Sequence, residues 1–291
     1  MQYPVVAVGD DTGLIKFIDH NGDIKHIGTQ ERGESVKSIS RYQDKILVAR
    51  KNGKIQTLDL EGNFTDIQTP TKSELVKTKV LDELVISMYT NKSIKIGDEE
   101  IKTNYNEARD FSIFDNFLGT CGKGDVVGIY DFTTKQSVWK ARPQERHENV
   151  VDMACILRDN KDFFVATAHN EMKLYDIRAQ RKAVKVQRLN PKDLSCDYAI
   201  NTLALSEDRE FVYAGDTVGH IYKINTQLTT IGKTKGRSVG SIRSIEENDG
   251  MLYSCGLDRY LRIHNSRALD LIEKHYLWQK LNALLVIPAP L

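Results

Sequence analysis

The chain has 291 residues, of which 28% are charged and 40% hydrophobic, a composition typical of a folded globular protein. A chain of this length can bury about three quarters of its unfolded surface, so a large core is possible. Lysine and arginine number 41 against 40 aspartates and glutamates, which excludes a general basic field. Any contact with nucleic acid must therefore come from local patches.

The N-terminal residues, MQYPVVAVGDD, lack the basic start and the long apolar core of a signal peptide. The longest mainly apolar run, residues 281–287, is far too short to span a bilayer. The four cysteines show no metal-clip spacing, and we expect buried thiols in a reducing compartment at Cys121, Cys155, Cys196 and Cys255. These observations predict an intracellular, soluble protein.

A strand-turn-strand pattern recurs along the chain at intervals of roughly 40 residues. Its seven copies align on an Asp or Asn that closes the second strand of each pair: Asp19, Asp59, Asp98, Asp131, Asp176, Asn225 and Asn265. The strands before these positions read LIKFID, KIQTLD, SIKIGD, VVGIYD, MKLYD, HIYKIN and YLRIHN. An apolar strand precedes each of them, and two more strands fit most intervals. Four short strands per repeat predict an all-β, seven-bladed β-propeller that fills one domain, residues 1–291.

Three stretches differ from the regular pattern. The chain starts with the second strand of its first blade (Val5 to Val8), so we expect residues 281–287 to supply the missing inner strand and close the ring. Blade three has the shortest interval, 33 residues, and is the least certain repeat. The segment from Asp270 to Leu281 comes nearest to a helical pattern, although its first part, LIEKHYL, also fits a strand.

Residues with catalytic or metal-binding potential are scattered. No two of the seven histidines have the spacing of metal ligands. Asp10, Asp216 and Asp258 lie in or beside hairpin turns, where carboxylates usually accept backbone N–H bonds. Gly122 to Gly124 form part of a hairpin turn with no helix after it, unlike a phosphate-binding loop. We therefore expect no enzyme activity, no metal and no cofactor.

Two stretches in the last four blades carry basic residues and no acid: residues 177–192 with six and residues 217–245 with five. A propeller has two rims, and we expect one rim to carry a basic arc made of Arg142, Arg146, Arg188, Lys192, Lys233, Lys235, Arg237 and Arg259. Arg178, Arg181 and Lys182 are expected on the opposite rim. No aromatic platform is interleaved with the arc in the sequence. Contact with a phosphate backbone or an acidic partner is therefore favoured over base reading, and simple solubility is the alternative.

The hairpins ending in YD, LD or ID resemble degenerate WD repeats. More narrowly, SCGLDRYLRIH followed by HYLWQKLNALLV resembles the last repeat and closing strand of one WD-repeat family, the nucleolar assembly factor of the large (60S) ribosomal subunit precursor. LYDIRAQRKAV, GDTVGHIYKIN, VGSIRSI and CGKGDVVGIYD support the resemblance, which covers roughly the last 60% of the chain. The connection from Arg142 to Val150 is shorter than in that family, and a lysine-rich tail is missing.

The resemblance implies a non-catalytic scaffold in ribosome biogenesis. Its expected partners are other large-subunit assembly factors, a AAA-type ATPase that binds transiently, and pre-rRNA backbone; its expected location is the nucleus and nucleolus. The residues expected to bind partners are Arg259, Arg262, Lys233, Lys235, Arg237, Arg178, Arg181, Lys182, Arg142 and Arg146. Two alternatives stay open: an adaptor of another complex, such as a ubiquitin ligase, and a propeller enzyme with a metal or paired carboxylates at its channel.

Overall fold

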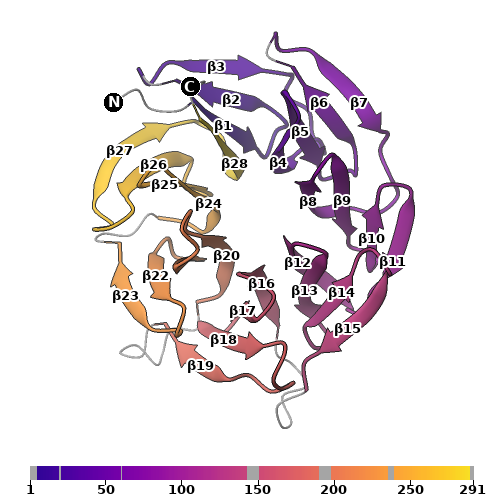
Figure 1. Ribbon diagram of the computed structural model, residues 1–291. Coiled ribbons are helices and arrows are strands. Elements are labelled where there is room, and N and C mark those ends of the chain that lie inside the picture. The colour runs from indigo at the N-terminus through magenta and orange to yellow at the C-terminus, as the bar shows by residue number, and fades with distance from the viewer. Residues whose placement is uncertain are drawn as a thin grey trace.

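The computed structural model describes residues 5–19, 21–59, 61–142, 151–189, 198–234 and 239–288. Its strands form seven antiparallel sheets of four strands each, arranged as blades around a central channel (Figure 1). The described residues contain no helix, and thus none that is long and apolar enough to cross a membrane. The all-β, seven-bladed propeller predicted from the repeats is confirmed.

Each blade runs from an inner strand at the channel to an outer strand at the circumference. In that order, blade one is β28 (Leu281–Ile287), β1 (Val5–Asp10), β2 (Ile15–Ile18) and β3 (Ile24–Ile27); blade two is β4 (Val36–Tyr42), β5 (Lys45–Arg50), β6 (Ile55–Leu58) and β7 (Phe64–Gln68). Blade three is β8 (Leu75–Leu81), β9 (Leu84–Tyr89), β10 (Ser93–Ile96) and β11 (Glu99–Lys102); blade four is β12 (Glu107–Phe114), β13 (Phe117–Lys123), β14 (Gly128–Asp131) and β15 (Gln136–Lys140).

Blades five to seven repeat the same order. Blade five is β16 (Asp152–Leu157), β17 (Asp162–Thr167), β18 (Glu171–Asp176) and β19 (Lys185–Arg188). Blade six is β20 (Ile200–Leu205), β21 (Phe211–Asp216), β22 (Ile221–Asn225) and β23 (Thr230–Lys233). Blade seven is β24 (Ile242–Asn248), β25 (Met251–Gly256), β26 (Tyr260–Asn265) and β27 (Leu271–Tyr276). Blade three, the least certain repeat, is thus complete.

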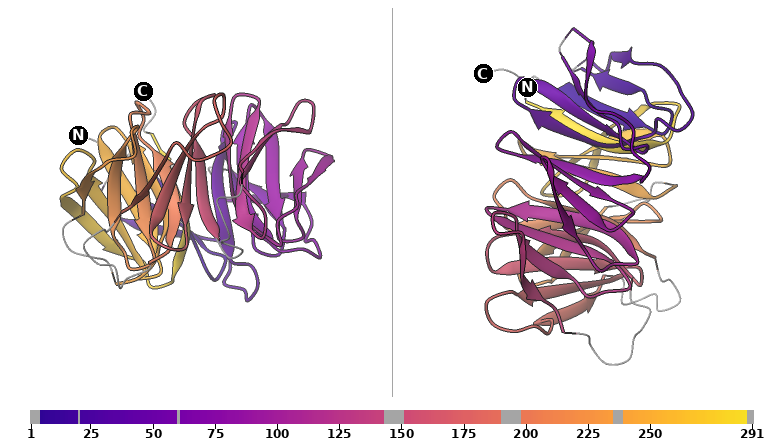
Figure 2. Two further views of the ribbon diagram at one scale, coloured as in Figure 1. Left: turned by 90° about the horizontal axis from the view of Figure 1, so that it is seen from below. Right: turned by 90° about the vertical axis from the view of Figure 1, so that its right-hand side faces the viewer.

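The core lies between the blades rather than inside one central cluster. Second strands such as β1 (VVAVGD) and β21 (FVYAGD) are apolar on both faces because each face packs against a neighbouring blade. Seven separate clusters of buried side chains fill the seven gaps between adjacent blades. Seen from the side, the blades stand next to one another around the ring (Figure 2). Each blade is therefore stabilised mainly by its two neighbours.

The aligned Asp or Asn of the repeats has a physical reason. In six blades its side chain accepts N–H bonds from the following turn, as Asp19 does from Asn21 and Asp23, both at 2.9 Å. These turns connect the third strand to the outer strand. Blade three differs because a two-residue turn, Gly97–Asp98, joins its strands, and Gly97 adopts a φ of 58°.

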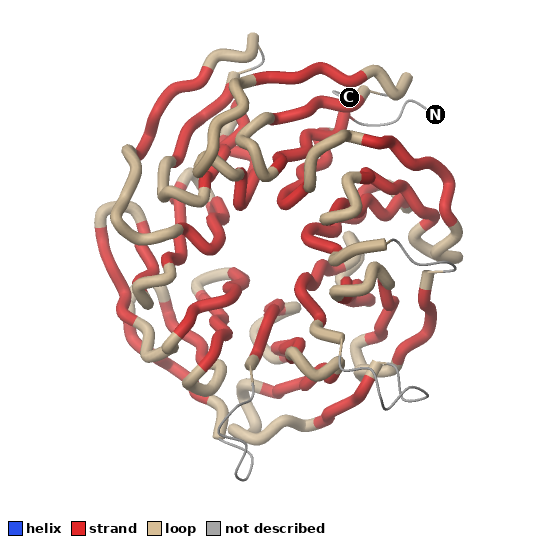
Figure 3. Tube along the Cα trace, turned by 180° about the vertical axis from the view of Figure 1, so that it is seen from behind, coloured by secondary structure: helices blue, strands red, loops and turns tan. Residues whose placement is uncertain are grey.

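The ring closes as the sequence predicts. β28 pairs antiparallel with β1 from Val5–Ile287 to Asp10–Leu281, so residues from both ends of the chain share blade one. Strands β1 and β28 lie side by side in blade one (Figure 1), and the strands form the same closed ring when seen from behind (Figure 3). The helical reading of residues 270–281 is wrong, since β27 and the start of β28 occupy that segment. Strand pairing at the edge of blade seven outweighs the weak helical spacing.

Candidate interaction surfaces

Two kinds of connection meet on one rim of the propeller, which we call the upper rim. They are the turns between the second and third strands and the connections that lead into the inner strands. In blade seven, Leu257 N–H donates to Ser241 O at 3.0 Å, and in blade two Lys51 N–H donates to Ser35 O at 2.8 Å. The same bond recurs in blades one, three, five and six, so each of these turns is fastened to the connection that leads into the inner strand of its own blade.

The hairpin with the sequence SCGLDRYLRIH forms part of this rim. Asp258 holds its turn by accepting the Tyr260 N–H at 3.3 Å, as predicted. Arg259 adopts a φ of 72°, and its side chain is exposed. Arg262 is largely buried and pairs with Asp258 at 2.5 Å, so this arginine stabilises the hairpin itself. Of the two arginines, Arg259 is the one whose side chain is exposed and can contact a partner.

Four aromatic rings lie in a row beside this hairpin, and we call them the aromatic ladder. Tyr260 packs against Tyr276 with a centroid distance of 5.1 Å, and Tyr276 against Trp278 at 6.0 Å. His26, from the outer strand of blade one, continues the row at 6.1 Å from Trp278. Tyr276 and Trp278 are 42% and 54% exposed. The row crosses the junction between blades seven and one at the outer edge of the ring.

Basic side chains lie on the same ladder. Arg262 and Lys274 stack over the ring of Tyr260 at 5.1 and 5.8 Å. An Arg259 Nη1–H donates to the Tyr276 hydroxyl at 3.5 Å. The expectation that no aromatic platform lies beside the basic arc is therefore wrong at Arg259, the arc residue that contacts these rings. The rings come from two blades that are adjacent only after ring closure, which the linear sequence does not show.

The backbone holds the ladder in place through one buried residue. Leu277 is fully buried, and its N–H donates to Arg259 O at 2.8 Å, which fastens the end of β27 to the hairpin turn. Its carbonyl accepts the ammonium of Lys16 from blade one. With Leu277 fixed inward, the neighbouring Trp278 takes a φ of 61° and points outward. The signal that the sequence offers is HYLWQK, in which two aromatics flank one leucine.

The other predicted site residues are spread along the outer edge. Lys233 is exposed and stacks over the Tyr222 ring at 5.2 Å, while Arg178 pairs with Asp176 at 3.7 Å. Arg142 N–H donates to Arg181 O at 2.7 Å, and Lys182 next to it is exposed. The expected separation of Arg142 and Arg181 onto two rims is wrong, because the strongly twisted outer strands run around the circumference and bring the two backbones together. Arg146, Lys192, Lys235 and Arg237 lie outside the described residues.

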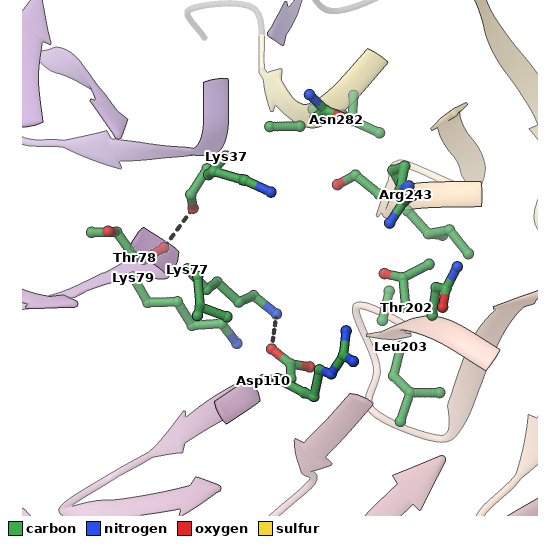
Figure 4. Close-up of a pocket in the computed structure, with 18 of the residues that line it drawn as sticks. Lys37, Lys77, Thr78, Lys79, Asp110, Thr202, Leu203, Arg243 and Asn282 are labelled. Atoms are coloured by element: carbon green, nitrogen blue, oxygen red, sulfur yellow. Dashed lines mark hydrogen bonds and ion pairs between the residues drawn. The ribbon is translucent and has the colours of Figure 1, made fainter. Parts of the chain in front are cut away.

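The inner strands enclose a cavity of about 590 Å³ along the axis, and Figure 4 shows the polar side chains that line it. On one wall Lys77 pairs with Asp110 at 2.5 Å, and the other oxygen of Asp110 accepts the Cys155 N–H at 3.1 Å. Burial works against the charge of Lys77, but Asp110 outweighs it and raises the Lys77 pKa. This carboxylate therefore joins blades three, four and five.

The remaining polar groups from the sequence analysis have structural partners. Asp10 and Asp216 accept backbone N–H bonds in their turns, as predicted. Cys121, Cys155 and Cys255 are buried free thiols, and Cys196 lies outside the described residues. Within the described ranges, no three His, Cys, Asp or Glu side chains cluster as metal ligands would.

The fold and its surfaces define a WD-repeat-like β-propeller, and comparisons with known proteins confirm this class. No family model matches the chain. A WD repeat-containing protein of Dictyostelium discoideum is 25% identical over 96% of this chain, which spans 58% of that relative. Bovine WD repeat-containing protein 74 is 24% identical over 97% of this chain and 80% of its own length. The human protein of the same name is 31% identical over 58% of this chain and 45% of its own length.

One solved structure shows the same fold at low sequence similarity. It is the crystal structure of the computationally designed Ika8 protein, with a TM-score of 0.64 and 13% identity, covering 87% of this chain and 90% of that chain. This likeness supports the fold alone. The relatives named WD repeat-containing protein 74 bear out the resemblance drawn from SCGLDRYLRIH and the other quoted stretches.

Proposed function

We propose that this protein is a non-catalytic scaffold that binds precursors of the large (60S) ribosomal subunit and supports pre-rRNA processing. The single observation that carries a binding role is the aromatic ladder, with exposed Tyr276 and Trp278 beside Arg259. Tryptophan, tyrosine and arginine are the residue types that dominate binding energy at protein interfaces. A propeller whose core lies between its blades presents such a surface on a rigid support.

Two observations direct this binding role to ribosome assembly. The sequence resembles the nucleolar assembly factor of the large subunit, and the chain is similar to proteins named WD repeat-containing protein 74. On this proposal the partners are other large-subunit assembly factors, a AAA-type ATPase that binds transiently, and pre-rRNA backbone along the upper rim. The protein would act in the nucleus and nucleolus.

A sedimentation experiment tests the proposal. The tagged full chain is expected to sediment with large-subunit precursors, and the double variant Tyr276→Ala, Trp278→Ala is expected to shift at least tenfold toward the free fraction. A matched control removes two exposed hydrophobic side chains from other outer strands, Ile67→Ala with Val138→Ala, and should leave sedimentation unchanged.

Three results would contradict the proposal. Sedimentation of the wild-type chain as a free protein, without precursor RNA, would remove the ribosome role. Co-purification with ubiquitin-ligase subunits instead would support the alternative of a substrate receptor. Equal losses in the ladder variant and in the control would show that the ladder is not the binding surface.

A further inference from the structure

Each inner strand carries a β-bulge at the same place, one residue after its first buried position. The register against the second strand shifts there in all seven blades, for example between Val36 and Ser38 in blade two. The bulged residues all line the channel at its upper mouth, and we call them the bulge ring: Lys37, Val76, Arg109, Met153, Asn201, Arg243 and Asn282. A bulge re-aims the side chain that it carries, here toward the axis.

The chemistry of the bulge ring is one-sided. It holds three basic residues, two amides and two apolar side chains, and no acid. Four hydrogen-bond donors follow one another over blades six, seven, one and two: Asn201, Arg243, Asn282 and Lys37. The third base, Arg109, stands apart on blade four and pairs with Glu107 at 2.9 Å.

Lys37 and Arg243 differ from Arg109 in their ion pairing. Among the described residues, no carboxylate lies within 4.0 Å of either charged group. Both extend into the cavity on either side of Asn282 (Figure 4). Burial, and then the positive charges of Lys51 and Arg243, lower the Lys37 pKa, while burial lowers the Arg243 pKa. Two cations that repel each other in a partly buried mouth are stabilised by an anion between them.

The acids that line the same cavity are already engaged. Glu74 pairs with Lys51 at 3.1 Å, Asp110 pairs with Lys77, and Glu247 accepts the Tyr213 hydroxyl at 3.0 Å. Glu246 accepts the Val286 N–H at 3.0 Å. A third cation, Lys79, lies below the mouth without a carboxylate at ion-pair distance among the described residues. Among the described residues that line the cavity, Lys37, Lys79 and Arg243 are therefore the cations without a carboxylate at ion-pair distance.

We propose that the channel mouth binds a small anion with two or three phosphate groups, held between Lys37 and Arg243. The amides of Asn201 and Asn282 already donate to Ser241 Oγ at 2.6 Å and Ser35 Oγ at 3.1 Å, which fixes their orientation. Each amide nitrogen keeps a second N–H for a phosphate oxygen. The cavity of about 590 Å³ lies within the size range of small-ligand sites. This inference goes beyond the proposed scaffold role and does not rest on it.

Calorimetric titration of the purified full chain with sodium tripolyphosphate tests the site at low salt. Arg243→Gln and Lys37→Gln are each expected to weaken binding about tenfold, since each removes one charged hydrogen-bond donor to the phosphate. The matched control is Arg109→Gln, which makes the same substitution at the same register position but removes a charge already paired with Glu107. It should change the affinity less than about threefold.

If Arg243→Gln and Arg109→Gln weaken tripolyphosphate binding equally, the binding reflects general electrostatic attraction, and the proposed site is wrong. The proposal is also wrong if tripolyphosphate does not bind. A thermal melt of each variant checks that the fold is intact. A short single-stranded RNA serves as the second probe. If the RNA competes with tripolyphosphate, and both Lys37→Gln and Arg243→Gln weaken RNA binding, the site binds the phosphates of a nucleic-acid backbone. If the RNA does not compete, the site binds the free anion. Neither result needs a ribosomal particle.

Discussion

Glu246 carries a carboxyl group in a position that disfavours its charge. Burial against blade one raises its pKa from 4.5 to about 7, although the Val286 N–H opposes the shift. The folded state thus binds a proton more tightly than the unfolded state, so stability falls as the pH rises from 4.5 to 7. Glu246→Gln is expected to remove this fall and to stabilise the protein by about 1–3 kcal/mol at pH 8. Urea unfolding of both proteins at pH 5 and pH 8 measures the effect; an equal gain at both values would contradict it.

His264 shows the opposite dependence. Burial and then the charge of Arg262 lower its pKa from 6.5 to about 4, so the folded state holds it neutral. Stability from this group is present above pH 6.5 and is lost as the pH falls toward 4, by about 2–3 kcal/mol. His264→Gln should flatten this part of the pH–stability curve. The free energy of unfolding is measured for both proteins between pH 7.5 and pH 4.5. If its dependence on pH is the same in the variant, His264 is not the source of that dependence.

Lys16 is fully buried and bonds across the junction of blades one and seven. Its ammonium pairs with Asp10 at 3.1 Å and donates to Gln279 Oε1 at 2.5 Å. Lys16→Met leaves the Asp10 carboxylate buried without its cation, which should cost about 3–5 kcal/mol of unfolding free energy. Adding Asp10→Asn removes that charge and should restore at least half of the loss. No recovery in the double variant would show that the bonds to blade seven, rather than the ion pair, carry the effect.

Among the elements, β28 decides whether the ring is closed. Leu281 is fully buried in the cluster that joins blades seven and one, with Val6, Val8 and Leu261. Leu281→Ala should destabilise the protein by about 2–4 kcal/mol, because it removes buried surface and leaves a cavity. Leu271→Ala on the exposed edge strand is the control and should change stability by less than about 0.5 kcal/mol. Chemical denaturation measures the free energy of unfolding of both variants. If Leu281→Ala costs as little as Leu271→Ala, the packing of Leu281 does not hold the ring closed.

The fold was predictable from the sequence because each blade repeats the same local chemistry. The apolar second strand and the Asp or Asn after the third strand recur in all seven copies, so even blade three could be placed. The twist that carries the outer strands around the circumference has no sequence signal, so the strand pattern predicts Arg142 and Arg181 on different rims although they are hydrogen-bonded. Closure by residues 281–287 followed from a strand missing at one end and a surplus strand at the other.

At the scale of the whole molecule, the candidate surfaces depend on contacts between distant segments. Arg259 could be selected from its hairpin turn, but the aromatic ladder needs His26 and Trp278, which ring closure brings together. The bulge ring needs one residue from each of seven inner strands. Only the positions of the bulges, which depend on pairing register, bring Lys37 and Arg243 to one level. Sequence reasoning therefore found basic residues but not their grouping.

The charge on the upper rim makes a prediction about the intact protein. Arg259→Glu should weaken association with precursor particles at least fivefold and lower its salt dependence, because a phosphate or acidic partner loses one cation. The melting temperature should move by less than about 2 °C, because Arg259 is exposed and its contact with Tyr276 is long. Sedimentation at two salt concentrations measures this. Unchanged association would return Arg259 to a role in solubility.

Sharing blade one between distant segments also sets an order of events during synthesis. Until residues 281–287 have left the ribosome, the edge of β1 that faces the channel is unpaired. Six blades can assemble before that moment, but the molecule remains open and liable to pair with other chains. β28 is thus the strand that converts a stack of blades into a closed ring. A peptide with the sequence of β28, supplied separately to a chain that ends before Leu281, should bind this edge and restore a cooperative melt.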